Sequence, residues 1–250
     1  MVPFEMTLNK SSKIKDLLTW RILPLAVVAG TVWYCRKKGV GLKIKAFMIT
    51  KVMGRLHKKE EILMHKKELF SRLKDNWRSN KKLVILEIGV GGGSNFEFYP
   101  PGSQIICLDP NPNFEVYIRD KSREAGVEVQ RFIWGSAEDL SGVGDNTVDA
   151  VVSSFVFCCI QDTSQVLGEI IRVLKPKGVF YFMEHVLDKK GTFLHKAQKA
   201  LHSITGTTRL QKETGRDIET AGFSETEINN FYSNTFICMI KPMVWGRATK

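Results

Sequence analysis

The chain has 250 residues, with 37 Lys and Arg, 26 Asp and Glu and five cysteines, a length that suits one folded domain and an additional segment. Residues 1–82 carry 20 basic and 6 acidic side chains, whereas residues 83–250 carry 17 basic and 20 acidic ones. The mild acidity of this larger part predicts no nucleic-acid partner. The cysteines form no CxxC pair, which predicts a reducing compartment and no metal site.

An uncharged segment of 14 residues, 22–35, lies between basic residues near the N-terminus. It is shorter than the roughly 20 residues that a helix needs to cross a bilayer. The basic residues 36–38 that follow it disfavour a cleaved signal peptide, and the surrounding lysines disfavour a buried core helix. We therefore expect residues 1–55 to be a hydrophobic and basic membrane-anchor segment, with the domain on the cytosolic side.

Residues 42–77 place apolar side chains at helical spacing, with lysines between them. This pattern is typical of a basic amphipathic helix on a membrane surface, and it also fits a helix packed on the domain with a solvated outer face. We expect the first part to lie on lipid and the part from about residue 57 to lead into a domain of residues 56–250.

Short aliphatic runs alternate with helical stretches after residue 82. The alternation predicts a doubly wound α/β fold, in which a parallel sheet is covered by helices on both faces. The predicted strands are 83–89, 103–109, 127–134, 147–154 and 178–186, followed by 225–232 and 234–246. The predicted helices are 94–99, 113–126, 163–176, 191–208 and 210–222.

A glycine-rich turn follows the first predicted strand, where Gly89, Gly91 and Gly93 form the pattern G-x-G-x-G. Because glycine has no Cβ atom, the turn can adopt positive φ and a ligand can approach its backbone. Ser94 stands where the dinucleotide fingerprint requires glycine, and the turn lacks the lysine of a phosphate loop.

Two carboxylates flank this turn at the edge of the sheet where ligands bind in such folds. Glu87 precedes the turn and would attract an ammonium or a sulfonium, whereas Asp109 ends the second strand, where an acid binds ribose hydroxyls. The pair predicts a nucleoside with a cationic amino-acid tail, a description that S-adenosylmethionine fits. A surface charge for Glu87 and a turn residue for Asp109 are the alternatives.

Several motifs carry a resemblance to a known family. The pattern E-x-G-x-G-x-G, the acid of CLDP, GSAEDL and RVLKPKGVFYF resemble the class I S-adenosylmethionine-dependent methyltransferases. Within them, LEIGVGGGSNFEFYPPG, CLDPNPNFE, FVFCCI and RVLKPKGVFYFMEHV resemble the membrane-associated thiol S-methyltransferases, from about residue 63 to the C-terminus. The resemblance implies the Rossmann-like, seven-stranded sheet of this class, with an antiparallel last strand.

The resemblance also implies S-adenosyl-L-methionine as the cofactor. Val90 and Gly92 stand where these relatives usually show Cys and Thr, side chains that a backbone cradle does not need. Ser136 stands where many class I enzymes have Asp, so the adenine contact is expected from Ala137 and from Glu138 or its neighbour. The expected cofactor-binding residues are Glu87, Gly89, Gly91, Gly93, Asp109, Pro110, Ala137, Glu138 and Ser154.

A polar pair, Glu184 and His185, ends the fifth predicted strand, where the substrate is expected. A histidine can take the proton of a thiol and a carboxylate can set its tautomer, so we interpret this pair as candidate catalytic residues. Adjacent strand residues point to opposite faces, so structural roles for both are the alternative. Cys158 and Cys159 are interpreted as core residues, because direct methyl transfer needs no enzyme thiol.

These observations predict an enzyme that transfers a methyl group from S-adenosylmethionine to small lipophilic thiols at a membrane surface, without a metal. The resemblance implies the cytosolic face of the endoplasmic reticulum membrane, and lipid droplets, as its location. One alternative is methylation of a lipid-like oxygen or ring carbon, as in quinone or sterol pathways. Others are a non-catalytic lipid-droplet protein with a vestigial fold and an RNA methyltransferase with a basic arm.

Overall fold

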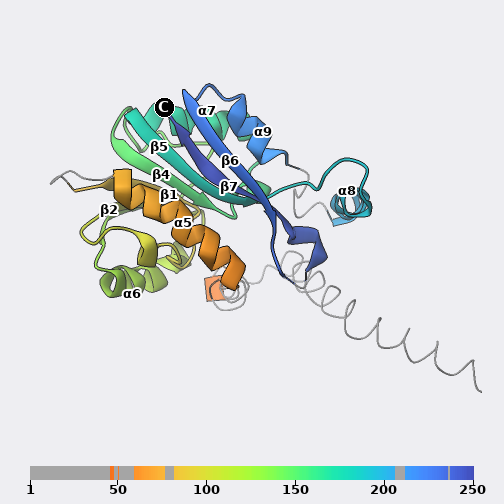
Figure 1. Ribbon diagram of the computed structural model, residues 1–250. Helices are drawn as coiled ribbons and strands as arrows, with labels where there is room; N and C mark the ends of the chain where they lie inside the picture. The colour runs from red at the N-terminus through yellow and green to blue at the C-terminus, as the bar shows by residue number, and fades with distance from the viewer. Residues whose placement is uncertain (1–45, 48–49, 51–58, 77–81, 206–211, 236) are drawn as a thin grey trace, which may run out of the picture. The chain divides into compact units, whose positions relative to one another are not determined.

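The computed structural model describes residues 46–47, 50, 59–76, 82–205, 212–235 and 237–250 (Figure 1). The chain divides into two units, Met1–Gly41 and Leu42–Lys250, and all described residues belong to the second. The predicted anchor segment therefore lies almost wholly outside the described residues, as does its predicted boundary at residue 55. Within the described part of the chain, none of the helices combines the length and the apolar character needed to cross a membrane.

Seven strands form one mixed sheet in the order β3-β2-β1-β4-β5-β7-β6. Strands β1 to β5 run parallel, and β7 lies antiparallel between β5 and β6. The predicted doubly wound, Rossmann-like sheet with an antiparallel last strand is thereby confirmed. The strands are β1 (Val84–Ile88), β2 (Gln104–Leu108), β3 (Glu128–Ile133), β4 (Val148–Ser154), β5 (Leu174–His185), β6 (Glu225–Tyr232) and β7 (Pro242–Thr249).

Helices cover both faces of the sheet (Figure 1). Helices α5 (Glu60–Asn76) and α6 (Glu115–Ala125) share one core cluster with residues of β1, β2 and β5, whereas α7 (Thr163–Val173) and α9 (Thr214–Glu219) share a second cluster on the other face. Because both faces are covered, β1 is an almost continuous apolar run, and β4 has a buried apolar centre at residues 150–152. The chain also forms α8 (Phe193–Thr205) and the 3-10 helices η3 (Phe96–Phe98), η4 (Pro112–Phe114), η5 (Phe157–Cys159) and η6 (Cys238–Ile240).

Several elements differ from the prediction, and two of the differing boundaries lie near a proline. The predicted helix 163–176 ends at Val173 and β5 begins at once, because Pro176 restricts the residue before it to an extended conformation. The predicted strand 234–246 begins only at Pro242, after η6, since proline lacks a ladder donor and is tolerated at the first position of a strand. The predicted helix 94–99 is only the 3-10 turn η3, and 210–222 contains only the short α9.

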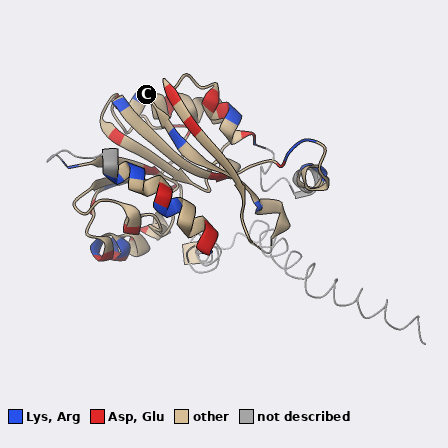
Figure 2. Cartoon of the chain, in the orientation of Figure 1, with Lys and Arg blue, Asp and Glu red and all other residues tan. Residues whose placement is uncertain are grey.

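The surface helices carry charges of both signs, as Figure 2 shows for α5 and α6. On α6 the guanidinium of Arg119 pairs with Glu115 one turn earlier, and on α5 Arg72 pairs with Glu68 in the same way. Such exposed pairs contribute little stability, typically about 0.3–0.5 kcal/mol each. Neither α5 nor α6 therefore presents charges of a single sign.

The parallel strands β1, β2, β4 and β5 end along the same edge of the sheet, which we call the carboxyl edge. Its loops are the glycine turn after β1, the residues from Asp109 after β2, and η5 after β4. These loops place the predicted site residues together.

Candidate active site

The glycine turn after β1 has the backbone conformation that its sequence predicts. Gly89, Gly91 and Gly93 have φ values of 64°, 51° and 73°, a region that other residues rarely adopt. A Cβ atom on Gly89 would lie 2.3 Å from Cγ2 of Val156, so glycine is also required by the close approach of the loop after β4. The N–H groups of Gly89 and Val90 donate to the Leu108 carbonyl, at 2.8 and 3.1 Å, which attaches the turn to the end of β2.

Glu87 is the centre of a buried polar network on the α5 face of the sheet. Tyr99 donates its hydroxyl to Oε2 of Glu87 at 2.7 Å, and Asn95 donates Nδ2 to Oε1 at 2.9 Å. Lys66 of α5 donates its ammonium to Oδ1 of the same asparagine at 2.8 Å. The Asn95 amide nitrogen also donates to Ser154 Oγ at 3.2 Å, so the predicted residues Glu87 and Ser154 are brought together.

Burial dominates the electrostatics of this network. It raises the pKa of Glu87 to about 7, although the Tyr99 and Asn95 hydrogen bonds and the charge of Lys66 favour ionisation. It lowers the pKa of Lys66 to about 8, against the attraction of Glu87 and Glu97. Near neutral pH the carboxyl group can therefore change its charge in response to a cationic ligand.

Asp109 holds the glycine turn from the side of β2. Its Oδ2 accepts from Gly91 N at 3.1 Å and its Oδ1 accepts from Asn111 N at 2.9 Å. Burial raises the pKa of the Asp109 carboxyl, and the two backbone donors oppose that rise. Pro110, the next predicted cofactor residue, is exposed beside it.

The predicted adenine contacts lie on the loop between β3 and β4. Ala137 is buried and Glu138 is half-buried. A carboxylate oxygen of Glu138 accepts from Gln161 N at 2.7 Å, and its carbonyl accepts from Gln165 Nε2 at 2.8 Å. Glu138 therefore joins this loop to the start of α7, on the side of the carboxyl edge that includes η5.

Glu184 holds the loop after β4 by hydrogen bonds, from the face of the sheet opposite to α5. Its carboxylate is fully buried and accepts from Ser153 Oγ at 2.6 Å, from Val156 N at 2.8 Å and from Phe157 N at 3.1 Å. Burial raises the pKa of Glu184 to about 8, against these three donors. Its hydrogen bonds lead to the loop and to β4, so a structural function is visible in the geometry.

His185 lies on the α5 face, as the alternation of strand residues requires. Its Nδ1 is 2.9 Å from the carbonyl oxygen of Ile240, which assigns a proton to Nδ1 in the neutral ring, because a carbonyl only accepts. Nδ1 therefore donates to the backbone carbonyl of Ile240 and not to the carboxylate of Glu184. The ring is 5.0 Å from that of Phe155, and burial lowers the pKa of His185 to about 4.

Four residues of the site were not identified from the sequence. Asn95 and Tyr99 belong to the short aromatic segment after the turn, and Lys66 is one of many lysines at helical spacing. The fourth, Thr50, has a buried hydroxyl without a hydrogen-bond partner among the described residues, and a Cβ on Gly92 would lie 3.0 Å from it.

The site fits S-adenosylmethionine. A turn whose glycines lack Cβ atoms, the Thr50 hydroxyl without a partner among the described residues, and the acids Glu87 and Asp109 supply what a cationic nucleoside needs. Among the described residues, His, Cys, Asp and Glu form no group of three or more that could hold a metal ion.

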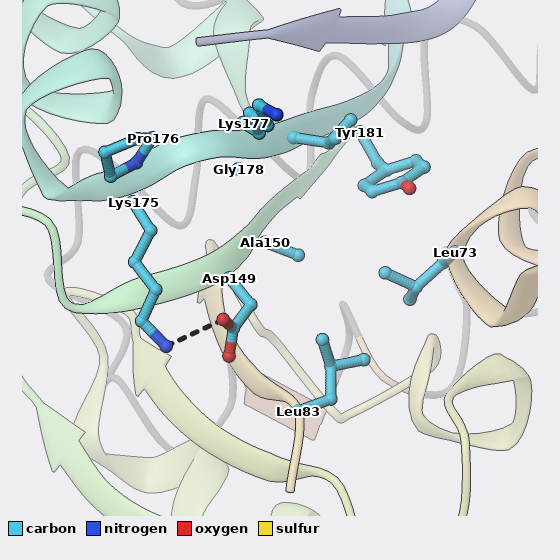
Figure 3. A pocket seen from close by; sticks show the side chains of 10 residues that line it. Leu73, Leu83, Asp149, Ala150, Lys175, Pro176, Lys177, Gly178 and Tyr181 are labelled. Atoms are coloured by element: carbon cyan, nitrogen blue, oxygen red, sulfur yellow. Dashed lines mark hydrogen bonds and ion pairs between the residues drawn. The ribbon is translucent and has the colours of Figure 1, made fainter. Parts of the chain in front are cut away.

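A separate cavity of about 160 Å³ lies at the opposite edge of the sheet (Figure 3). Its walls come from the beginnings of β4 and β5, including Asp149 and Lys175, which form an ion pair at 2.7 Å across its mouth, and from Leu73 of α5. Ligand pockets usually have volumes of about 300–1,000 Å³. This cavity is smaller and lies at the amino ends of the strands, so it is not the site built by the carboxyl-edge loops.

Comparisons with known proteins identify the family of the chain. Residues 86–182 match a family described as a methyltransferase domain. Thiol S-methyltransferase TMT1A of Homo sapiens is 35% identical over 196 residues, 76% of this chain and 80% of that protein. Thiol S-methyltransferase TMT1B of Rattus norvegicus is 35% identical over 209 residues, 82% of this chain and 85% of that protein.

A solved structure supports the fold alone. The N-methyltransferase NodS from Bradyrhizobium japonicum, in complex with S-adenosyl-L-homocysteine, superposes with a TM-score of 0.57 at 16% identity, over 78% of this chain and 90% of that one. With the turn, the two acids and the sheet order in place, these similarities lead to one conclusion. The chain is an S-adenosylmethionine-dependent methyltransferase of class I fold and belongs to the thiol S-methyltransferase family.

Proposed function

We propose that this enzyme transfers the methyl group to small lipophilic thiols. The observation that carries the proposal is the 35% identity to thiol S-methyltransferases over most of the chain. The geometry supports it, since the residues of η5 and β5 at the carboxyl edge are mainly aromatic or apolar, with Phe155 packed on His185. A thiol needs little activation, because alkyl thiols are partly ionised near neutral pH.

The bound cofactor supplies an electrophilic methyl group on a sulfonium. In the proposed arrangement the ionised Glu87 carboxylate attracts the positive amino-acid end, with Lys66 and Tyr99 fixing its position through the buried network. Asp109 and Pro110 serve the ribose, and Ala137 and Glu138 the adenine. The backbone of Gly89, Gly91 and Gly93, together with Ser154, completes this cofactor site.

His185 is the candidate residue for the thiol proton, and its pKa limits that role. Moving a proton from a thiol of pKa about 8.5 to a base of pKa about 4 costs about 6 kcal/mol. We therefore propose that the acceptor enters as the thiolate and that the neutral ring of His185 shapes the acceptor site. Glu184 is proposed to act as a positioning residue that holds the η5 loop.

The substrate proposal predicts S-methylation of butanethiol by the purified full chain with labelled S-adenosylmethionine. A quinol precursor and a phospholipid serve as oxygen, carbon and nitrogen acceptors in parallel reactions.

Asp109→Ala is expected to weaken cofactor binding by more than tenfold in calorimetry, because it removes the acceptor that holds Gly91. Near-normal cofactor binding by the variant would contradict the role of Asp109, whereas methylation of the quinol with none of the thiol would refute the substrate proposal.

Cofactor binding is predicted to tighten as the pH rises from 6 to 8. A carboxyl with a pKa of about 7 ionises over this range, so the dissociation constant should fall roughly tenfold if a cation binds the ionised form. The charged or titratable groups that interact with Glu87 are Lys66 from α5, Tyr99, Cys107 from β2, and Asp109 after β2. In Glu87→Gln this fall of the dissociation constant should vanish. Titration of the cofactor itself affects both proteins equally, so dividing one pH profile by the other removes it. Identical profiles for both proteins would contradict the role of Glu87.

The roles of the polar pair predict different losses. Glu184→Ala leaves three donors unsatisfied and is expected to lower the free energy of unfolding by about 3 kcal/mol or more, whereas Ser153→Ala should lower it by about 1 kcal/mol.

His185→Gln should retain kcat within about tenfold. The methylation rate of this variant should depend on the pKa of the thiol substrate. A loss of 100-fold or more in His185→Gln at unchanged stability would indicate a general base instead.

We further propose that the enzyme works on the cytosolic face of the endoplasmic reticulum membrane and on lipid droplets. The uncharged segment 22–35 with its basic flanks supports an anchor. Helix α8 offers a second contact, since Phe193 is 87% exposed and exposed Lys190 and Lys196 lie near it. Gln198 fixes this helix to the domain through the backbone of Asp188, Val186 and Met239.

The membrane proposal predicts that deleting residues 1–41 releases most of the protein from microsomes and lipid droplets. Residual binding of the shortened protein to phosphatidylserine-containing vesicles should fall at high salt and in Phe193→Ser. Val116→Ser on α6, a residue that is 62% exposed, is the matched control and should bind as before. Equal flotation of full-length and shortened proteins with vesicles would contradict the anchor.

A further inference from the structure

Two adjacent cysteines lie at the carboxyl edge, in the loop that borders the cofactor site. The sulfur atoms of Cys158 and Cys159 in η5 are 3.7 Å apart. Cys158 is half-buried and Cys159 is exposed, so their interpretation as core residues is wrong for Cys159, whereas Cys107 is buried. Neither sulfur is needed for the methyl transfer proposed above.

The surroundings of the pair favour ionisation of one sulfur. The hydrogen bond between the thiols lowers the pKa of Cys159 to about 7 and raises that of Cys158. The carboxylate of Asp109 raises the pKa of Cys159, against this hydrogen bond, whereas the carboxylate of Glu184 raises the pKa of Cys158 further.

We propose that Cys158 and Cys159 form a redox-active dithiol that reacts with small disulfides and whose oxidation stops cofactor binding. The thiolate of Cys159 attacks one sulfur of R–S–S–R, the disulfide bond breaks, and one RS⁻ leaves and takes a proton from water. Cys158 then loses its proton to solvent and attacks the Cys159 sulfur of the mixed disulfide, which expels the second RS⁻. The two cysteines are oxidised by two electrons and R–S–S–R is reduced to two thiols.

The loop connects this chemistry to the cofactor site. A disulfide requires sulfurs about 2.05 Å apart, so the 3.7 Å separation must close. The trans peptide bond keeps adjacent Cα atoms about 3.8 Å apart, below the usual range for bridged cysteines, so the bridge can close only if the backbone torsions of η5 change. The same loop carries Val156, which packs against Gly89 of the turn, and Phe157, whose N–H is held by Glu184. A shift of η5 therefore disturbs the turn that receives the cofactor.

The test uses the full chain in detergent, treated with dibutyl disulfide and then freed of reagent. Peptide mapping is expected to show a peptide containing Cys158 and Cys159 that has lost two hydrogens. Calorimetry is expected to show that the dissociation constant for S-adenosylmethionine has risen at least tenfold. Dithiothreitol should restore both. Only the choice of dibutyl disulfide as probe rests on the proposed function; the readouts are mass and cofactor binding, so they stand even if butanethiol is not methylated.

Cysteine variants assign the steps. Cys158→Ser should stop at a butylthio adduct on Cys159, and Cys159→Ser should bind cofactor normally before and after treatment. Cys238→Ser, an exposed cysteine of η6, is the matched control and should respond as the wild type does. Unmodified thiols in the treated wild type, an unchanged dissociation constant after oxidation, or continued sensitivity of Cys159→Ser would each overturn the proposal.

Discussion

Two carboxylates buried at one edge of the sheet hold the loops that make the active site. Glu87 accepts hydrogen bonds on the α5 face and Glu184 accepts them on the opposite face. A buried carboxylate is costly unless each oxygen has a donor. The donors come from Asn95 and Tyr99 for the first acid, and from the Ser153 hydroxyl and the backbone at the start of η5 for the second. The need to satisfy these acids therefore fixes the positions of both loops.

The sheet could be predicted because its strands are buried. The runs 83–89 and 147–154 have apolar side chains on both faces, which only a covered, mostly parallel sheet explains. The glycine turn could be predicted because three glycines with positive φ leave few other interpretations. The limits of β5 and β7 could not, since Pro176 and Pro242 act on ladders whose partner strands lie far along the sequence.

The supporting residues of the site were harder to find for a physical reason. Lys66 has the same sequence environment as its neighbour Lys67, yet one is buried and the other exposed, because the orientation of α5 on the sheet decides which lysine meets Asn95. The exposure of Cys159 likewise follows from the 3-10 turn of η5, not from its apolar neighbours. Such side chains depend on contacts between segments distant in the sequence.

The position of Lys66 has a consequence for exchanging parts between relatives. The segment that matches the methyltransferase domain, 86–182, begins after α5 and ends before β6 and β7. A fragment with those limits would leave Glu87 without its cation and would expose the edge of β5 to pairing with another chain. A chimera joined between α5 and β1 would likewise exchange Lys66 together with the N-terminal segment, whereas a junction before residue 60 would keep Lys66 and Glu87 from the same protein.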